Sequence, residues 1–303
     1  MHSLRRPKLM TLEEVLDLVP EGSSIAFGGF LLHNKPSAFA RALAKRKVAN
    51  LTLFASPTGA YEADLLIGAG LVRTVYAGLI CFEHLGLAPK FRQAAEAGAI
   101  EIIECEESLT VGGLLATIQG LPYHPVTSLR GTDIAKVSPL VKRYVSPFGE
   151  ELLAAPALAP DVAVIHAQQA DEFGNVRQFG ARFADQIIAK ASRTVIVTVD
   201  EVISHQEIAS TPGQTTIPGN LVDAVVAVPF GAHPCASHLR YIFDEPHLSS
   251  YLTAAEASRV DPADGSFDRY LRRFVYEPAS HEDYLARLGG PAYLATLRKG
   301  WLE

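Results

Sequence analysis

The feature of this sequence that most constrains its fold is a regular alternation of short apolar stretches with segments of helical periodicity. Stretches rich in Val, Ile, Leu and Phe predict strands at residues 24–27, 51–54, 72–77, 100–103, 161–167, 194–199 and 224–228. Helical spacing predicts helices at residues 36–44, 63–69, 90–97, 108–118 and 185–191. This alternation is typical of a parallel sheet with both faces covered. We therefore predict the α/β class: an open, parallel-rich sheet with helices on both faces.

The segments outside this alternation predict a capped N-terminal helix, a loop region and a helical tail. Thr11 and Glu14 form a capping box before a helix that Pro20 ends. Residues 120–160 predict ordered loops over a site, because six prolines interrupt recurring apolar residues there. We predict one domain over residues 1–303, with 246–303 a helical C-terminal extension that packs through one apolar face, formed by Phe267, Tyr270, Leu271 and Phe274.

Composition excludes several classes of function. The chain has 303 residues, and its 27 basic and 33 acidic residues give a net charge of −6 without a basic run, which argues against nucleic-acid binding. Its apolar stretches are shorter than the roughly 20 residues that span a bilayer, so we expect no membrane partner. Three widely spaced cysteines fit buried thiols in a reducing compartment. We expect a cytoplasmic protein.

Gly28-Gly29-Phe30 at the end of the first predicted strand is the first candidate site. Paired glycines there let a ligand approach the backbone, and free N–H groups bind a phosphate or a carbonyl oxygen. The third glycine of a dinucleotide fingerprint is missing, and a packing role fits the pair as well.

Two further candidates carry charge. The first is an acidic cluster in and after a predicted strand, at the end of which open α/β sheets bind ligands: Glu101, Glu104, Glu106 and Glu107. Glu106 and Glu107 also precede a helix whose dipole favours acidic residues. In the functional interpretation one of these carboxylates, Glu107, faces the substrate as a general base or an orienting acceptor. Arg130, in the segment 128–133 with Gly131 and Thr132, could bind a carboxylate or phosphate, or the segment could be an ordinary turn.

Other motifs of catalysis are weak. His233, Cys235 and His238 lie close in sequence, but a metal site normally needs three or four ligands and no second set appears, so we predict no metal. The sequence has no G-x-S-x-G, P-loop or zinc-protease motif.

Taken in order, several motifs resemble the A subunit of glutaconate CoA-transferase and its family I CoA-transferase relatives. The resemblance runs from about Thr11 to Leu288. Its carriers are Ile25–Phe30, Lys35-Pro36, Leu65–Gly70, Gly120–Pro122 with Pro125, Asp161–Ala170, Gly174–Arg177, Val222–Val226 and Gly231–Pro234.

This resemblance implies an enzyme that moves CoA from an acyl-CoA to a free carboxylic acid. It implies coenzyme A as substrate with no tightly bound cofactor, and a homologous B subunit in an α2β2 assembly. The nucleophile would be a glutamate of the B subunit, which forms an acyl-glutamyl anhydride and then a glutamyl-CoA thioester. This chain would line half of the pocket with Gly28, Gly29 and Phe30 and with the regions of Ser56 and Arg130.

Two alternatives stay open at this point. The acidic pair at Glu106-Glu107 also resembles the two-subunit hydrolase that opens a ring of a CoA-linked steroid-degradation intermediate, in which an A-subunit glutamate is catalytic; Glu107 matches it. The third interpretation is a CoA-binding subunit that only scaffolds another enzyme.

Overall fold

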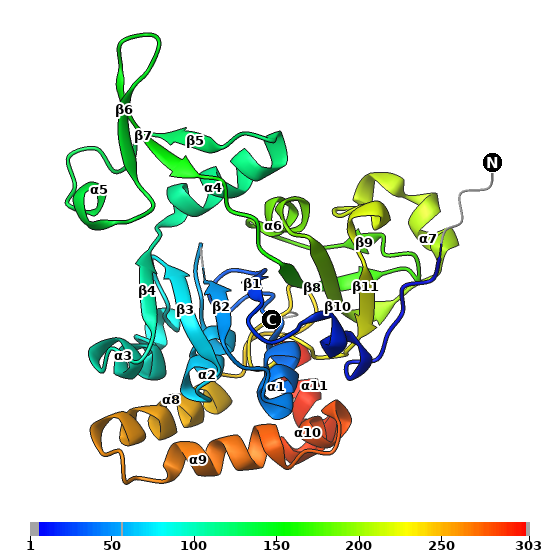
Figure 1. Cartoon of the computed structure of the whole chain (residues 1–303). Helices are drawn as coiled ribbons and strands as arrows, with labels where there is room; N and C mark the ends of the chain where they lie inside the picture. Colours follow the sequence, from blue (N-terminus) through cyan, green and yellow to red (C-terminus); the bar gives the residue numbers. More distant parts are fainter. Residues whose placement is uncertain (1–5, 56, 301–303) are drawn as a thin grey trace.

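The structure, a computed structural model, describes residues 6–55 and 57–300 and contains two sheets (Figure 1). The larger sheet has the strand order β11-β10-β8-β1-β2-β3-β4, with all neighbours parallel, and the short strand β9 pairs antiparallel with β8. Its strands are β1 (Ser24–Phe27), β2 (Leu51–Phe54), β3 (Val72–Ala77), β4 (Glu101–Glu104), β8 (Val162–Ala170), β9 (Val176–Arg177), β10 (Thr194–Val202) and β11 (Ala224–Ala227). The prediction of an open, parallel-rich α/β sheet is confirmed.

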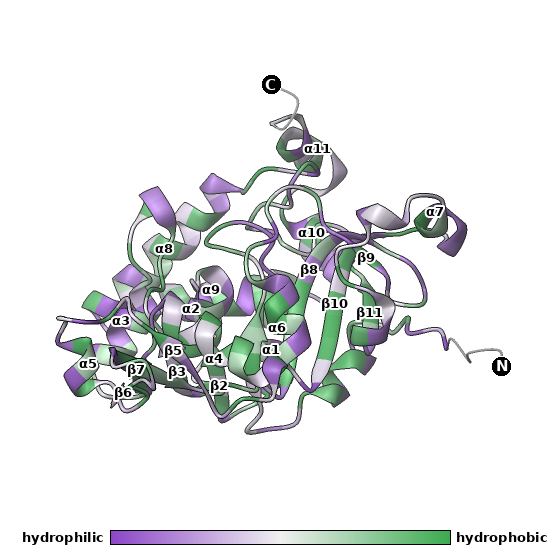
Figure 2. Cartoon of the chain, turned by 90° about the horizontal axis from the view of Figure 1, so that it is seen from above, coloured by the Kyte–Doolittle hydropathy of each residue, from purple (hydrophilic) through white to green (hydrophobic). Residues whose placement is uncertain are grey.

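Both faces of this sheet are buried, because successive side chains of a strand point to opposite sides. In β1, Ile25 and Phe27 join one apolar core and Ala26 joins the other. All nine residues of β8 are buried, as expected for a central parallel strand. Figure 2 shows its neighbour β10 as hydrophobic along most of its length. The covering helices are α1 (Ser37–Arg46), α2 (Tyr61–Gly68), α3 (Pro89–Glu96), α4 (Glu107–Gln119) and α6 (Asp185–Ala191).

The predicted loops at residues 120–160 are wrong, since this segment forms a second sheet. Three antiparallel strands, in the order β5-β7-β6, make a small lobe together with the short helix α5. Their bounds are β5 (Tyr123–Val126), α5 (Ile134–Val137), β6 (Lys142–Val145) and β7 (Glu151–Pro156). The prolines that suggested loops are tolerated because Pro125 lies in an edge strand and Pro156 ends its strand.

The first predicted helix is also different in kind. The capping box forms as expected: the Thr11 hydroxyl accepts a hydrogen bond from the Glu14 amide, and the Glu14 carboxylate accepts one from the Thr11 amide at 2.8 Å. Residues Glu14–Leu18 then make a 3₁₀ turn rather than an α-helix. Pro20 follows too soon for the i to i+4 ladder to extend.

The C-terminal segment consists of helices with breaks, not of one continuous helical run. The helices are α8 (Glu245–Val260), α9 (Ser266–Leu271), a π-helical turn (Arg272–Tyr276), α10 (His281–Arg287) and α11 (Gly290–Lys299); α7 (His205–Ser210) lies earlier, after β10. Phe267, Tyr270 and Leu271 are buried and Phe274 packs beside them, so the predicted apolar face of the tail is confirmed. None of the helices in the described ranges is long and apolar enough to cross a membrane.

Candidate functional site

The candidate site lies at the carboxyl edge of the parallel sheet, where the segments that follow β1 to β4 meet below the small lobe (Figure 1). Open α/β sheets bind their ligands at this edge. Gly28-Gly29-Phe30 follows β1, and Glu106-Glu107 follows β4. Ser56, predicted to line the pocket, lies outside the described residues.

The two glycines after β1 allow a buried carboxylate to approach the backbone. The Gly29 amide donates to Asp185 Oδ1 at 2.8 Å, and a Cβ on Gly28 would lie 2.8 Å from the same oxygen. Gly29 has φ +76°, where a side chain is also strained. The Gly28 amide donates to Val164 O, and the Phe30 amide donates to His33 O. The expectation of free N–H groups at this strand end is therefore wrong, because the chain itself supplies their acceptors.

Asp185, the first residue of α6, is 1% exposed at this point. Its second oxygen accepts from Gln178 Nε2. Burial raises the pKa of Asp185 to about 6, and the bond from Gly29 opposes that rise. This carboxyl group holds the loop after β1 in place, across 156 positions of sequence.

Aromatic side chains surround the Phe30 end of that loop. The rings of Phe30 and Phe183 stack with centroids 5.0 Å apart, and those of His33 and His238 are also 5.0 Å apart. Phe183 is 38% exposed and has φ +45°, an uncommon conformation for a bulky residue. Burial and the neighbouring His33 lower the pKa of His238. This rim, formed by Phe30, His33, Phe183 and His238, is partly open to solvent.

The loops after β1 and β2 are fixed to each other by a buried ion pair. Lys35 Nζ lies 3.1 Å from Glu62 Oε1, with both side chains 1% exposed, and it donates to Thr58 O at 2.7 Å. The Thr58 hydroxyl accepts from the Leu31 amide at 3.0 Å. These contacts therefore hold the loop that carries Phe30 and His33 against the segment after β2 and the start of α2.

The two adjacent glutamates after β4 have different environments. Glu106 is the N-cap of α4: its carboxylate accepts from the Ser108 amide at 2.9 Å, from the Ser108 hydroxyl, and from the Ser128 hydroxyl at 3.4 Å. Glu107 occupies the first turn of α4 and is exposed. Glu106 therefore has a structural role, and Glu107 is the carboxylate that a ligand at this edge can reach.

Arg130, Gly131 and Thr132 form an exposed turn between β5 and α5. Gly131 has φ +81°, and Thr132 Oγ1 donates to Leu129 O at 2.9 Å. The Ser128 contact with Glu106 places this turn beside the start of α4. The structure thus brings the acidic pair and the Arg130 turn together, as one group separate from the aromatic rim.

Cys105, Cys235 and His233 are buried in the core, whereas Cys81 is half-buried and His238 belongs to the aromatic rim. His233 is fully buried and binds Tyr284 and Asp244 at 2.7 and 2.9 Å. Burial raises the pKa of Cys105 to about 11 and raises that of Cys235 as well, so neither thiol is a ready nucleophile. Within the described ranges, no group of three His, Cys, Asp or Glu side chains is placed to hold a metal ion.

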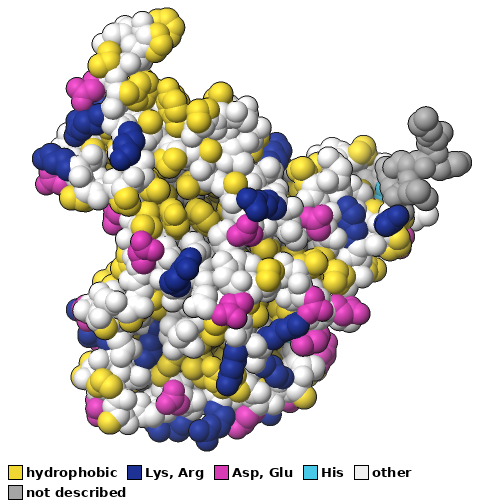
Figure 3. Space-filling model, in the orientation of Figure 1, with side chains coloured by type: hydrophobic (Ala, Val, Ile, Leu, Met, Phe, Trp, Pro, Cys, Tyr) yellow, Lys and Arg dark blue, Asp and Glu magenta, His cyan; other side chains and the backbone are white. Residues whose placement is uncertain are grey.

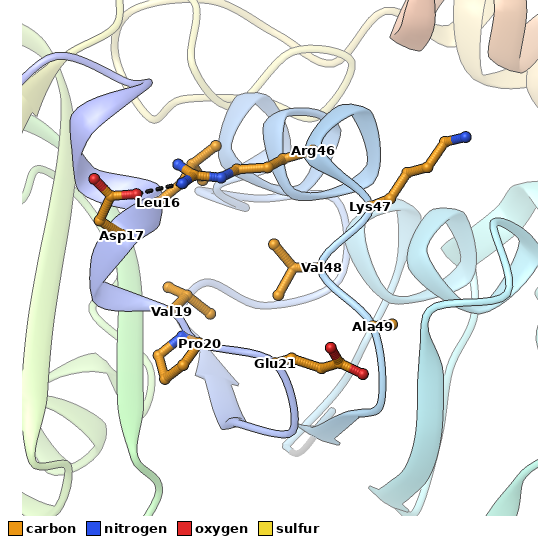
Figure 4. A pocket seen from close by; sticks show the side chains of 9 residues that line it. All are labelled: Leu16, Asp17, Val19, Pro20, Glu21, Arg46, Lys47, Val48 and Ala49. Carbon is orange, nitrogen blue, oxygen red and sulfur yellow. Dashed lines mark hydrogen bonds and ion pairs between the residues drawn. The ribbon is translucent and has the colours of Figure 1, made fainter.

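A surface pocket lies at the opposite edge of the sheet, between the 3₁₀ turn and the end of α1 (Figure 4). The side chains of Asp17 and Arg46 form an ion pair across it. It adjoins the amino ends of the strands, away from the edge at which such sheets bind ligands.

Sequence reasoning missed Asp185, Phe183, His33 and His238 as parts of this site. His238 stands out in the sequence only as a candidate metal ligand with His233 and Cys235, and Phe183 and His33 lie in no motif. Asp185 stands out only as the beginning of a predicted helix. The only local signal for its contact with Gly29 is the glycine pair. Adjacent glycines after a strand indicate that some group approaches the backbone closely, but they do not indicate which residue it is.

Known proteins match this chain over nearly its whole length, both in sequence and in structure. Residues 9–228 match the Coenzyme A transferase family. The chain is 34% identical to the A subunit of glutaconate CoA-transferase from Acidaminococcus fermentans, over 93% of this chain and 92% of that protein. The crystal structure of that organism's glutaconate coenzyme A-transferase superposes with a TM-score of 0.90 at 31% identity, over 96% of this chain and 95% of that one.

Two further relatives carry the names of different enzymes, a CoA-transferase and a hydrolase. The chain is 34% identical to the A subunit of 3-oxoadipate CoA-transferase from Pseudomonas knackmussii, over 88% of this chain and 94% of the relative. It is 30% identical to the cholesterol ring-cleaving hydrolase IpdA subunit of Rhodococcus jostii, over 93% of this chain and 96% of the relative.

Proposed function

Because the chain belongs to the coenzyme A transferase family, we propose that it is the A subunit of a two-subunit CoA-transferase, which moves CoA from an acyl-CoA to a free carboxylic acid. The similarity to the A subunit of glutaconate CoA-transferase carries this proposal, since it extends over 93% of the sequence and 96% of the structure. The partner is a homologous B subunit, and the assembly is α2β2.

The reaction proceeds through a glutamate of the B subunit. Its carboxylate oxygen attacks the thioester carbonyl and CoA leaves as a thiolate, which gives an acyl-glutamyl anhydride. The thiolate then attacks the glutamyl carbonyl, which releases the first acid and forms a glutamyl-CoA thioester; the acceptor acid reverses these steps. Within this chain, the carboxylates of Glu106 and Asp185 both accept hydrogen bonds from its own donors, so neither is free to act as the nucleophile.

This chain contributes one side of the pocket. Phe30 and the exposed Phe183 offer an apolar surface to the acyl group. Arg130 offers a planar cation to a carboxylate or to a phosphate of CoA. Gly131 and Thr132 belong to the same turn, and Gly28 and Gly29 act through the loop that they allow Asp185 to hold.

The second candidate is a CoA-dependent ring-opening hydrolase of steroid-degradation type. The exposure of Glu107 beside the capped Glu106 favours it, since a general base must be reachable by water and substrate. In this interpretation Glu107 takes a proton from water as the water adds to a ring ketone. The adjacent C–C bond then breaks to leave a carboxyl group on one side, and the carbon that leaves with the electron pair takes up the proton from Glu107, while CoA stays attached.

The deciding experiment uses the complex with the co-encoded B chain. It is incubated with a panel of acyl-CoA esters, with and without acetate or a dicarboxylic acid, and the products are read by mass spectrometry. Transfer of CoA to the acid supports the transferase, and an ester that gains one water and keeps its CoA supports the hydrolase. If no ester is converted, both proposals fail, and the result supports the interpretation of this chain as a CoA-binding subunit that only scaffolds another enzyme.

The reaction rate of the Glu107→Gln variant also distinguishes the transferase from the hydrolase. A transferase with its nucleophile in the B chain keeps activity within a few-fold, whereas a hydrolase that uses Glu107 as base loses a factor of about 10² or more. Glu282→Gln, a change of the same kind on the exposed surface of α10, is the matched control.

A further inference from the structure

The small antiparallel sheet has two faces of unequal burial, which its register defines. Residues directly opposite each other in antiparallel strands share a face. Val126 of β5 lies opposite Leu153 of β7, and His124 lies opposite Ala155. This face packs on α4, where the lack of side chains at Gly112 and Gly113 lets the sheet approach closely. Leu153 and Ala155 are completely buried there.

The opposite face of the same sheet is partly open to solvent and mostly apolar. By the pairing, Tyr144 lies opposite Leu152, and Pro125 lies opposite Ala154. We define the lobe face as these residues with their same-face neighbours: Tyr123, Pro125, Lys142, Tyr144, Leu152, Ala154 and Pro156. Lys142, which lies opposite Ala154, is the one charged member of this face. Tyr123 is 40% exposed, and its ring meets that of Tyr144 edge-on at 5.4 Å.

This composition is unusual for a sheet face in water. Antiparallel sheets with one buried face normally carry polar residues on the other. Moreover, two of the large apolar side chains that are exposed among the described residues, Tyr123 and Phe148, lie on the lobe face and at the tip of the β6–β7 hairpin. Figure 3 shows apolar side chains gathered on the lobe and in the hollow below it. Such a concentration marks an interaction surface.

The tip of the β6–β7 hairpin presents one further apolar side chain in a fixed turn. The Ser146 amide donates to Glu150 O at 2.8 Å, and the Gly149 amide donates to Ser146 O at 3.0 Å. The Ser146 hydroxyl accepts from the amides of Phe148 and Glu150, both at 3.2 Å. The side chain of Phe148 is 91% exposed in this turn. Because the hydrogen bonds already order the turn, binding a partner there costs little additional conformational entropy.

We propose that the lobe face and the Phe148 tip form the docking surface for the B subunit. This inference rests on the proposed two-subunit function, which requires a second chain to bring its carboxylate to the sheet edge. The lobe stands at that edge (Figure 1) and is joined to it, because the Ser128 hydroxyl contacts Glu106, and Arg130 Nη1 lies 3.4 Å from Glu151 O of β7. A chain that reaches the edge therefore meets the lobe.

The test places a charge on the lobe face and removes the aromatic tip. Tyr144→Glu and Phe148→Ser are each purified and titrated with the co-encoded B chain by calorimetry, after circular dichroism has shown native secondary structure. We expect the dissociation constant to rise about 30-fold or more in each variant, as for a central aromatic contact. The matched control is Val260→Glu, which puts the same charge on an apolar residue 71% exposed at the end of α8 and leaves the affinity unchanged.

Three results would overturn the inference. Affinity for the B chain that is unchanged in both variants rules out this surface, as does a loss of equal size in Val260→Glu. If the variants instead alter only the self-association of the isolated chain, the occupant is a second copy of this chain. These readouts measure assembly alone, so a complex that assembles through the lobe but transfers no CoA overturns the proposed reaction and leaves the docking surface standing.

Discussion

The large sheet buries both of its faces, whereas the small sheet buries only one. The body of the molecule encloses some of its ionisable groups in pairs, as it does Lys35 with Glu62 and His233 with Asp244. In the lobe, the ion pair of Arg143 and Glu151 is exposed and Phe148 is in solvent. Exposed ion pairs contribute little to stability, so the lobe depends on its contact with α4. The large sheet is therefore covered on both faces by this chain, whereas the lobe leaves one mostly apolar face partly uncovered.

The largest effect should follow from breaking a pair in the body. In Lys35→Ala the carboxylate of Glu62 stays buried without its cation, and its Oε2 already has no hydrogen-bond partner. We expect a loss of about 3–5 kcal/mol in the free energy of unfolding, measured by urea denaturation. The double variant Lys35→Met with Glu62→Leu should recover most of this loss, because it removes both charges. A loss below about 1 kcal/mol in Lys35→Ala would show that the pair is not enclosed.

The second prediction compares the two faces of the lobe. Leu153→Ala leaves a cavity against α4 and should cost about 3 kcal/mol, whereas Leu152→Ala, one residue away on the lobe face, should cost less than about 1 kcal/mol in the isolated chain. Hydrogen exchange of the β5, β6 and β7 amides measures both, since the lobe can open without the body. Equal costs would contradict the assignment of faces from the register.

The same contrast explains what the sequence could and could not predict. The strands of the body were predictable because a short, continuous apolar run such as Asp161–Ala167 is typical of a parallel strand that is buried on both faces. The lobe was not, because its open face shows Tyr and Pro where an isolated sheet would show alternating polar residues. Prolines at strand edges and ends, as at Pro125 and Pro156, then look like loop residues.

Within the site, local signals were readable and distant contacts were not. The acidic pair lies between a predicted strand and a predicted helix, and the segment of Arg130 shows ordinary turn residues in Gly131 and Thr132. The bond between Gly29 and Asp185 joins residues 156 positions apart, and His33 meets His238 only through the fold. In both pairs, the sequence around one residue contains nothing that indicates which distant residue it contacts.

The third prediction concerns Asp185 and pH. Its pKa is raised from 3.8 to about 6 by burial, so between these values the unfolded chain has lost a proton that the folded chain keeps. This group therefore makes stability fall as pH rises from about 4 to about 6. Asp185→Asn removes that dependence and still accepts from Gly29, while Gln178 Oε1, which has no partner, can turn to accept from the new amide. We expect the variant to gain about 2–3 kcal/mol relative to wild type between pH 4 and pH 7.

Unfolding curves at pH 4, 5.5 and 7 test this expectation. Leu153→Ala serves as the control, because it destabilises the protein without touching a titratable group, and its difference from wild type should not vary with pH. A difference between Asp185→Asn and wild type that is flat across this range would contradict the raised pKa.

The smallest effect should appear where the lobe joins the body, at the start of α4. Glu106→Ala removes the N-cap and the contact with Ser128, and should cost about 1 kcal/mol. Glu107→Ala removes only a favourable charge from the first helical turn and should cost about 0.5 kcal/mol or less. Thermal unfolding of both variants at low and high salt distinguishes the two, because salt screens the charge effect of Glu107 but not the loss of a cap. If Glu107→Ala proved the more destabilising, Glu107 would be part of the packing of this junction, and its availability to a ligand would be in question.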